Sequence, residues 1–205
     1  MLFDLTLIGF GVIGVETLNY LKKILIKKKI KNKIKIAIIE KNINNIPGGV
    51  AYSQINSKFG YFNNPLRLSH PEFIKWFNLE KNKKKIFDFG IKNRDYNLAT
   101  WVNDNEFILE KKYNHYKEIY LPRLIYSFYF KEKIINFLKN KKKINVSISF
   151  LKGEVNNINL KSYYNILPNN HFKYFLVSYD KKDNLIKKII NKRLKKINSK
   201  KIVIG

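Results

Sequence analysis

The chain contains no cysteine, the first of several absences that narrow its possible functions. Without cysteine there is no disulfide framework, no thiolate metal site and no cysteine nucleophile. The histidines, His70, His115 and His171, are too scattered for metal-ligand spacing, so no metal is expected. No apolar run approaches the roughly 18 residues of a membrane-spanning helix. No basic segment precedes Asp4, as a signal peptide would require. We therefore expect a cytoplasmic protein with no membrane partner.

Arginine is scarce although the chain is strongly basic. Of 41 basic residues only 4 are arginine and 37 are lysine, against 15 acidic residues, for a formal charge of +26. Such an excess is typical of proteins that bind nucleic acid or an anionic membrane. Arginine, however, is the preferred partner of phosphates and base edges, and the lysines are spread along the chain. Lysine, asparagine and isoleucine share A/T-rich codons, so we interpret the charge mainly as codon usage and disfavour nucleic acid as a partner.

The first fifteen residues carry the motif around which the chain is organised. An apolar run, Leu5–Ile8, is followed at once by Gly9, Gly11 and Gly14 in a GxGxxG pattern, and then by a helical pattern. Between a strand and a helix, this motif predicts dinucleotide binding. The first glycine permits the tight turn, the second the approach of a pyrophosphate, and the third close packing of the helix on the sheet. The free N–H groups and the dipole at the helix start favour phosphate charge.

The second half of the unit is also present. Lys35–Ile39 is typical of a buried strand, and Glu40 ends it, 26 residues after Gly14. An acid at this position accepts hydrogen bonds from ribose hydroxyls. Strand, helix, strand and terminal acid in this order indicate a dinucleotide site, and the alternative is an ordinary βαβ unit with a glycine-rich turn.

The middle of the chain is expected to be a mostly helical insert, from about residue 61 to 120. The pieces we expect there are a short amphipathic helix at 72–79, a polar break at 81–85, and a second small helical or irregular piece around Trp101, Tyr113 and Tyr116.

The last third alternates between helix and strand patterns. A long helix is predicted from Tyr120 to about Lys139, with Pro122 in its first turn, where a missing N–H costs nothing. Strands are expected at 145–150, 153–160, 174–179 and 202–204, with a basic helical or coiled connector at 187–196. The strands within about 153–180 are interpreted as a small antiparallel meander. A chain of 205 residues with 45% hydrophobic content is long enough to form one domain with a substantial core.

Four segments together resemble a known family. They are Ile8–Gly14; Ile38–Glu40 with Gly48–Ser53; Asn63–Pro65 with Leu68–Ser69; and Leu121–Arg123 with Tyr126. In this order they are similar to the FAD/NAD(P)-binding domain of the group that includes FAD-dependent urate hydroxylase and flavin-dependent aspartate N-monooxygenase. The resemblance implies an α/β fold: a Rossmann-like FAD/NAD(P)-binding domain over residues 1–205, with a parallel sheet, the small meander and the helical insert.

The resemblance also implies cofactors and site residues. FAD and NAD(P)H would be the cofactors of a flavin-dependent monooxygenase acting on an unknown small molecule: NAD(P)H would reduce the flavin, which then activates O₂. Gly9, Gly11 and Gly14 would face the FAD pyrophosphate, Glu40 the ribose, and the Val155 backbone the adenine. Ala51, Tyr52 and Asn63 would lie along the cofactor toward the flavin, and Arg123 would contact cofactor or substrate. For Tyr52 and Tyr126, core packing is an equal alternative. No catalytic residue is assigned.

Domains of this group continue beyond a strand equivalent to Ile202–Ile204, which the resemblance places parallel to Leu5–Ile8. We therefore expect a C-terminally truncated copy, with a separately encoded C-terminal half as a candidate partner. Two alternatives remain open. The chain is a non-catalytic remnant or nucleotide-binding module, or it is a lysine-rich nucleic-acid-binding protein.

Overall fold

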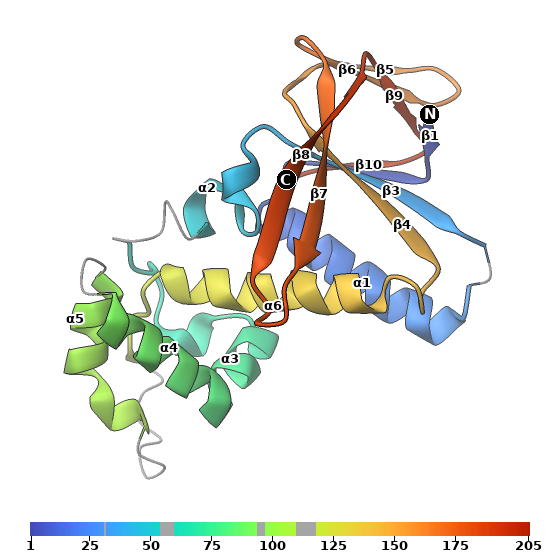
Figure 1. Ribbon diagram of the computed structural model, residues 1–205. Coiled ribbons are helices and arrows are strands. Elements are labelled where there is room, and N and C mark those ends of the chain that lie inside the picture. Colours follow the sequence, from blue (N-terminus) through green and yellow to red (C-terminus); the bar gives the residue numbers. More distant parts are fainter. Residues whose placement is uncertain (31, 54–59, 94–96, 110–117) are drawn as a thin grey trace. The chain divides into compact units, whose positions relative to one another are not determined.

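The computed structural model describes residues 1–30, 32–53, 60–93, 97–109 and 118–205 (Figure 1). The chain divides into two compact units. The first unit consists of Met1–Gly49 and Phe130–Gly205, and the second of Val50–Tyr129. Each is described by itself.

The described strands of the first unit form two sheets. The larger has the order β10-β2-β3-β4-β7-β8 and the smaller the order β1-β9-β6-β5. The strands are β1 (Leu2–Phe3), β2 (Leu5–Ile8), β3 (Ile34–Glu40), β4 (Val146–Lys152), β5 (Val155–Leu160), β6 (Tyr164–Pro168), β7 (Phe172–Tyr179), β8 (Leu185–Leu194), β9 (Ile197–Ser199) and β10 (Ile202–Ile204).

One half of the larger sheet is parallel, as the βαβ reading predicts. β10, β2, β3 and β4 are successive parallel neighbours, and Thr6 on β2 stands between Ile202 on β10 and Ala37 on β3. The predicted pairing of residues 202–204 with the first strand is therefore confirmed. Parallel strands are buried on both faces, which explains why the interior of β3 is a continuous run of aliphatic residues.

The other half of the larger sheet is antiparallel and differs from the sequence-based prediction. β7 pairs with β4 and with β8, whereas β5 pairs with β6 in the smaller sheet. The strands expected at 153–160 and 174–179 therefore exist, but they belong to different sheets. Residues 187–196 are not a helical or coiled connector, because most of them form β8. Backbone pairing of β8 with β7 outweighs the low strand propensity of the lysines in β8.

The two sheets pack against each other through a shared apolar core. Its buried members from the smaller sheet are Phe3, Ile166 and Ile197, and those from the larger sheet are Ala37, Ile39, Leu151, Phe172 and Tyr174. Helix α1 (Val12–Lys28) and residues 130–140 lie on the other side of the larger sheet (Figure 1). These two helical segments are joined by an ion pair between Glu16 and Lys133, with the Lys133 Nζ 3.0 Å from the carboxylate.

Helix α6 (Leu124–Asn140) begins in the second unit and ends in the first. Its predicted end is confirmed within one residue, but its start is later than predicted. Pro122 is not in the first turn, because it forms an isolated antiparallel bridge with Tyr61. The extended backbone of this bridge delays the helix until Leu124.

The described elements of the second unit are all helical, as predicted for the insert. They are α2 (Gly49–Tyr52, starting at the boundary), η2 (Leu66–Leu68), α3 (Pro71–Phe77), α4 (Glu80–Lys92), α5 (Asn97–Asp104) and η3 (Glu106–Leu109). The predicted polar break at 81–85 is wrong, since it is the first part of α4. Burial of Asn82, Ile86, Phe87 and Gly90 gives α4 one interior face, and its lysines occupy the others. Tyr113 and Tyr116 lie outside the described residues.

Candidate functional site

The glycine loop connects β2 to α1 at the carboxyl end of the parallel strands. Gly9 leaves β2 with φ +83°, and its N–H donates to the Ile39 carbonyl at 2.9 Å. Gly11 is the N-cap of α1 and supplies no side-chain cap. Phe10, between them, is fully buried, and its ring meets Phe150 of β4 edge-on at 6.2 Å. The loop is thus anchored to the sheet, and the first turn of α1 contains no acidic residue that would repel an anion.

The three motif glycines differ in what the protein itself requires of them. A Cβ on Gly9 would overlap the Gly205 carbonyl oxygen. A Cβ on Gly14 would lie 2.9 Å from the Phe10 ring and 3.0 Å from the Gly9 carbonyl oxygen. A Cβ on Gly11, in contrast, would meet only the Gly49 Cα, at an ordinary 3.8 Å. Packing therefore requires glycine at the first and third positions, whereas the described residues leave room for a Cβ at Gly11.

A second glycine pair lies against the first loop. Gly48 and Gly11 form a parallel bridge, and Gly49 adopts φ +70°. A Cβ on Gly49 would lie 2.9 Å from the Gly11 Cα, so only glycine permits this approach. The segment after β3 therefore returns to the glycine loop and packs against it. This contact was not foreseen from the sequence, although the adjacent glycines, which tolerate positive φ, were a usable signal.

Glu40 ends β3 beside the glycine loop and is 8% exposed. Its Oε2 accepts from the Phe10 N–H at 2.9 Å, and its Oε1 accepts from the Asn42 N–H at 3.0 Å. The carboxylate thus ties the loop after β2 to the segment after β3. Each carboxylate oxygen has a second lone pair, so capacity remains for ribose hydroxyls.

The segment after β4 completes this edge of the sheet. The Gly153 N–H donates to the Glu40 carbonyl at 3.1 Å, and Glu154 forms an exposed ion pair with Lys41 at 2.8 Å. Val155 begins β5, pairs with Pro168 and packs partly against the core between the sheets. Of the predicted site residues, the structure thus brings together Gly9, Gly11, Gly14, Glu40 and the segment that leads into Val155.

In the second unit, two of the family-like segments run side by side. The Phe62 N–H donates to the Leu121 carbonyl at 2.9 Å, and the Arg123 N–H donates to the Gly60 carbonyl at 2.7 Å. The Arg123 Nε also donates to the Tyr61 carbonyl at 2.9 Å. Arg123 therefore has a structural role, holding the strand-like segment that leads to Asn63.

Tyr52 and Tyr126 belong to an aromatic cluster of the second unit. Their rings lie 5.3 Å apart, and each also contacts Phe62. Tyr126 stacks on Phe73 at 3.9 Å. These contacts favour the core interpretation for both tyrosines. Ala51 and Asn63 are exposed.

Burial in this cluster predicts an alkaline titration for one phenol. Desolvation raises the pKa of Tyr126 to about 12, although hydrogen bonds with Ser69 and the His70 backbone act in the opposite direction. We expect the ultraviolet difference titration between the parent and Tyr126→Phe to show a midpoint well above the ordinary value of about 10. A midpoint near 10 would contradict the buried position.

The raised pKa of Tyr126 also determines the direction in which its contribution to stability changes with pH. The neutral phenol is favoured in the folded chain, so between pH 10 and about 12 the unfolded chain releases its proton first. The contribution of Tyr126 to stability is complete below pH 10 and is lost as pH rises through that window. Tyr126→Phe should therefore lose less stability than the parent over that range in chemical denaturation.

A glycine loop between a parallel strand and a helix, with an acid on the next strand, defines a dinucleotide-binding protein of the Rossmann type. A family model described as FAD-NAD(P)-binding matches residues 6–164. The chain belongs to this family, and FAD and NAD(P)H are therefore its cofactors. Comparisons with curated proteins and with solved structures found no match.

One structural observation supports the fit of a dinucleotide to the first unit. The space that a Cβ of Gly11 would fill is left open beside an uncapped helix start, which is where a pyrophosphate requires close approach. Elsewhere in the described residues, no group of three or more acidic or histidine side chains is placed to hold a metal ion. The helices that the structure describes include none long and apolar enough to cross a membrane.

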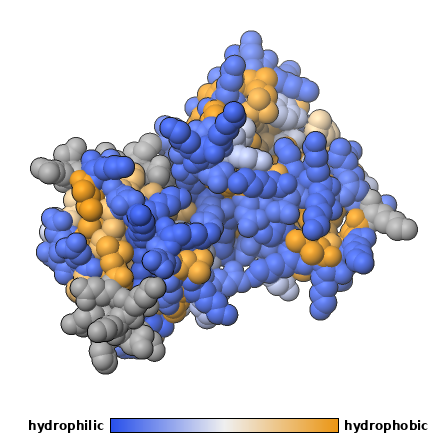
Figure 2. Space-filling model, turned by 60° about the horizontal axis from the view of Figure 1, so that its bottom comes forward, coloured by the Kyte–Doolittle hydropathy of each residue, from blue (hydrophilic) through white to orange (hydrophobic). Residues whose placement is uncertain are grey.

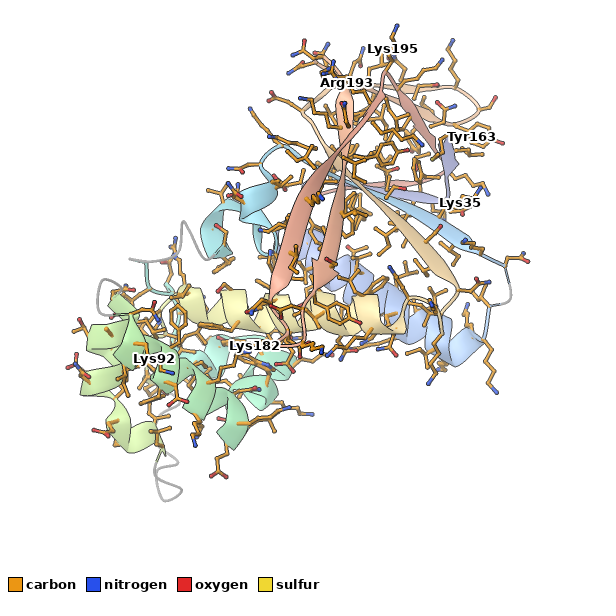
Figure 3. The ribbon with its side chains drawn as sticks, viewed as in Figure 1. Lys35, Lys92, Tyr163, Lys182, Arg193 and Lys195 are labelled. Carbon is orange, nitrogen blue, oxygen red and sulfur yellow. The ribbon has the colours of Figure 1, made fainter. Side chains whose placement is uncertain are left out.

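The positive charge is concentrated in the first unit. Its sequence has 28 basic and 7 acidic residues, a net +21, whereas the second unit has 13 and 8, a net +5. Figure 3 shows Arg193 and Lys195 near the end of β8 and Lys182 in the turn between β7 and β8. On the face shown in Figure 2, hydrophilic residues cover most of the surface between smaller hydrophobic patches. This field attracts anionic ligands in general, so tests of the site need charge-matched controls.

Proposed function

We propose that the chain is the cofactor-binding part of a flavin-dependent oxidoreductase of the monooxygenase type, similar to the urate hydroxylase and aspartate N-monooxygenase group. The observation that carries the proposal is Gly11, a glycine that internal packing does not require, at the start of α1. When bound in such an enzyme, FAD supplies the redox chemistry, taking hydride from NAD(P)H and passing electrons to O₂.

The first unit holds the proposed adenosine and pyrophosphate groups. The N–H groups at the start of α1 face the pyrophosphate, with Gly9 and Gly14 giving the turn and the packing that aim them. Glu40 accepts from the ribose hydroxyls, and the backbone at Val155 meets the adenine edge. Glu40 and the segment that leads into Val155 lie, like the glycine loop, at the carboxyl end of the parallel strands, where open α/β sheets bind ligands.

The second unit supplies the proposed flavin side. Ala51 and Asn63 are exposed and are proposed to line the cofactor, with Tyr52 presenting one edge of the aromatic cluster. Arg123 holds residues 60–61 through its backbone N–H and Nε donors and is proposed to orient the segment that carries Asn63. We propose one FAD/NAD(P)-binding domain over residues 1–205, with an insert at about residues 61–120.

The test starts from the cofactor. The purified chain is examined for bound flavin by visible absorption, and the flavin-free form is titrated with FAD by calorimetry. Anaerobic addition of NADH and NADPH in turn then shows whether bound flavin is bleached and which nicotinamide is preferred. Saturable FAD binding with bleaching supports the proposal, whereas no binding at millimolar FAD sinks it.

A nucleotide-binding module without turnover is a second candidate. It is favoured because the first unit by itself contains the glycine loop, Glu40 and the segment leading to Val155. This candidate predicts FAD or ADP binding without NAD(P)H-dependent bleaching, so the same titrations distinguish the two.

A further inference from the structure

Lys187 lies far from the glycine motif in sequence but, in the first unit, binds the segment that packs against it. It stands on β8, the outermost strand of the larger sheet, opposite Val177 of β7. Its side chain is partly buried, and its Nζ donates to the Ile43 carbonyl at 3.0 Å and to the Ile46 carbonyl at 2.8 Å. Desolvation lowers the pKa of this amine. Burying a charged amine is unfavourable unless its hydrogen bonds are made, and the two carbonyls of residues 43 and 46 meet that requirement.

The two carbonyls belong to the segment that packs on the glycine loop. Residues 41–49 leave β3 after Glu40, form a single turn capped by the Asn42 side chain, and end in the Gly48–Gly49 pair. Gly48 bridges to Gly11. At its start the segment is held by the Glu40 carboxylate through the Asn42 N–H, and at its end by Gly11. Lys187 holds its middle.

We propose that Lys187 is a positioning residue for the dinucleotide site, fixing residues 43–49 against the glycine loop. The proposal rests on the proposed placement of FAD at this loop. Each carbonyl that Lys187 binds lies within five residues of Gly48, so loss of the Nζ removes two hydrogen bonds from the segment that lies against Gly11. Residues 45–48 are buried and still hold the segment, so the loss loosens it without releasing it. In a fraction of the molecules, residues 41–49 then lie away from their ordered position. FAD binds the ordered molecules, so the apparent FAD affinity falls in proportion to the fraction that is ordered.

The test is a charge-matched pair of substitutions in the full chain. Lys187→Met keeps most of the apolar stem and removes the donors. Lys188→Met removes the same unit of charge from the neighbouring exposed position. We expect FAD affinity to fall about tenfold in Lys187→Met, the usual scale of coupling between sites, and to change less than twofold in Lys188→Met. Lys187→Arg, which retains charge and donors, should recover most of the loss.

Amide hydrogen exchange gives a readout without cofactor. Amides of residues 42–49 should exchange faster in flavin-free Lys187→Met than in the parent, while β3 and β4 stay protected. A fall in thermal stability with unchanged FAD affinity and unchanged exchange in this segment would make Lys187 merely structural and overturn the proposal. If the parent binds no FAD at all, it is the proposed function that fails.

The parent chain alone provides a second test, in case Lys187→Met does not fold. If the Lys187 contact favours FAD binding, FAD must by reciprocity stabilise the contact. Labelling with an amine-reactive reagent, followed by mass spectrometry, should modify Lys187 more slowly than Lys188, and saturating FAD should slow Lys187 further by about fivefold. Equal labelling of Lys187 with and without FAD contradicts the coupling.

Discussion

Gly11→Val should abolish measurable FAD binding while the chain stays folded, and Gly11→Ala should weaken binding at least tenfold. The first added carbon would lie at an ordinary 3.8 Å from Gly49 Cα, and the backbone at Gly11 has φ −77°, which any residue adopts. The fold therefore tolerates the methyl group. A pyrophosphate that approaches the backbone does not, because the side chain occupies its space. Calorimetric titration with FAD measures the loss, and thermal unfolding of the flavin-free chain measures the tolerance.

Gly14 is the matched control within the same motif. A Cβ there would lie 2.9 Å from the Phe10 ring and 3.0 Å from a backbone carbonyl, so Gly14→Val should lower stability by about 1–3 kcal/mol through overpacking. Loss of affinity with retained stability is thus expected at Gly11 and loss of stability at Gly14. If Gly11→Val binds FAD as tightly as the parent, the glycine loop does not face the pyrophosphate.

Glu40→Ala should reduce both stability and FAD affinity. The substitution leaves the buried Phe10 N–H without its acceptor and removes the bond to the Asn42 N–H. Hydrogen bonds to a charged group contribute about 1.5–3 kcal/mol each, so we expect a loss of about 2–4 kcal/mol in urea unfolding of the flavin-free chain. The lost ribose acceptor should weaken FAD binding by about 1.5–3 kcal/mol more, roughly 10- to 100-fold, measured where the variant is folded.

Glu154→Gln separates these effects from general electrostatics. Glu154 carries the same charge near Glu40, but its ion pair with Lys41 is exposed and should contribute little to stability. An unchanged FAD affinity in folded Glu40→Ala would place the ribose elsewhere. Unchanged stability would mean that the carboxylate does not hold the glycine loop.

Short-range patterns explain what sequence reasoning predicted well. The run Leu5–Ile8, the three glycines and Glu40 at the end of β3 each follow from periodicity and turn chemistry within a few residues. The parallel pairing of Ile202–Ile204 with β2 was predicted through resemblance, since no local pattern states which strand is the neighbour.

The sequence-based predictions that proved wrong concern segments in which tertiary contacts outweigh local preference. The lysines of α4 and β8 suggested a break and a connector. In the structure, Ile86 and Phe87 give α4 a buried face, and pairing with β7 makes β8 a strand. Composition alone could not distinguish these cases, because lysine extends into solvent from a helix, a strand or a loop alike.

The sequence by itself determined that the chain contains a strand–GxGxxG–helix–strand unit ending in an acid, and that it is an α/β protein. Only the tertiary structure decided which glycines the protein needs for its own packing. It also showed that Glu40 ties two loops together, and that Lys187 holds the segment lying against Gly11. The physical reason is range: turn and helix preferences act over neighbouring residues, whereas the Glu40–Phe10 and Lys187–Ile46 hydrogen bonds join positions 30 and 141 residues apart that only the packed sheet brings together.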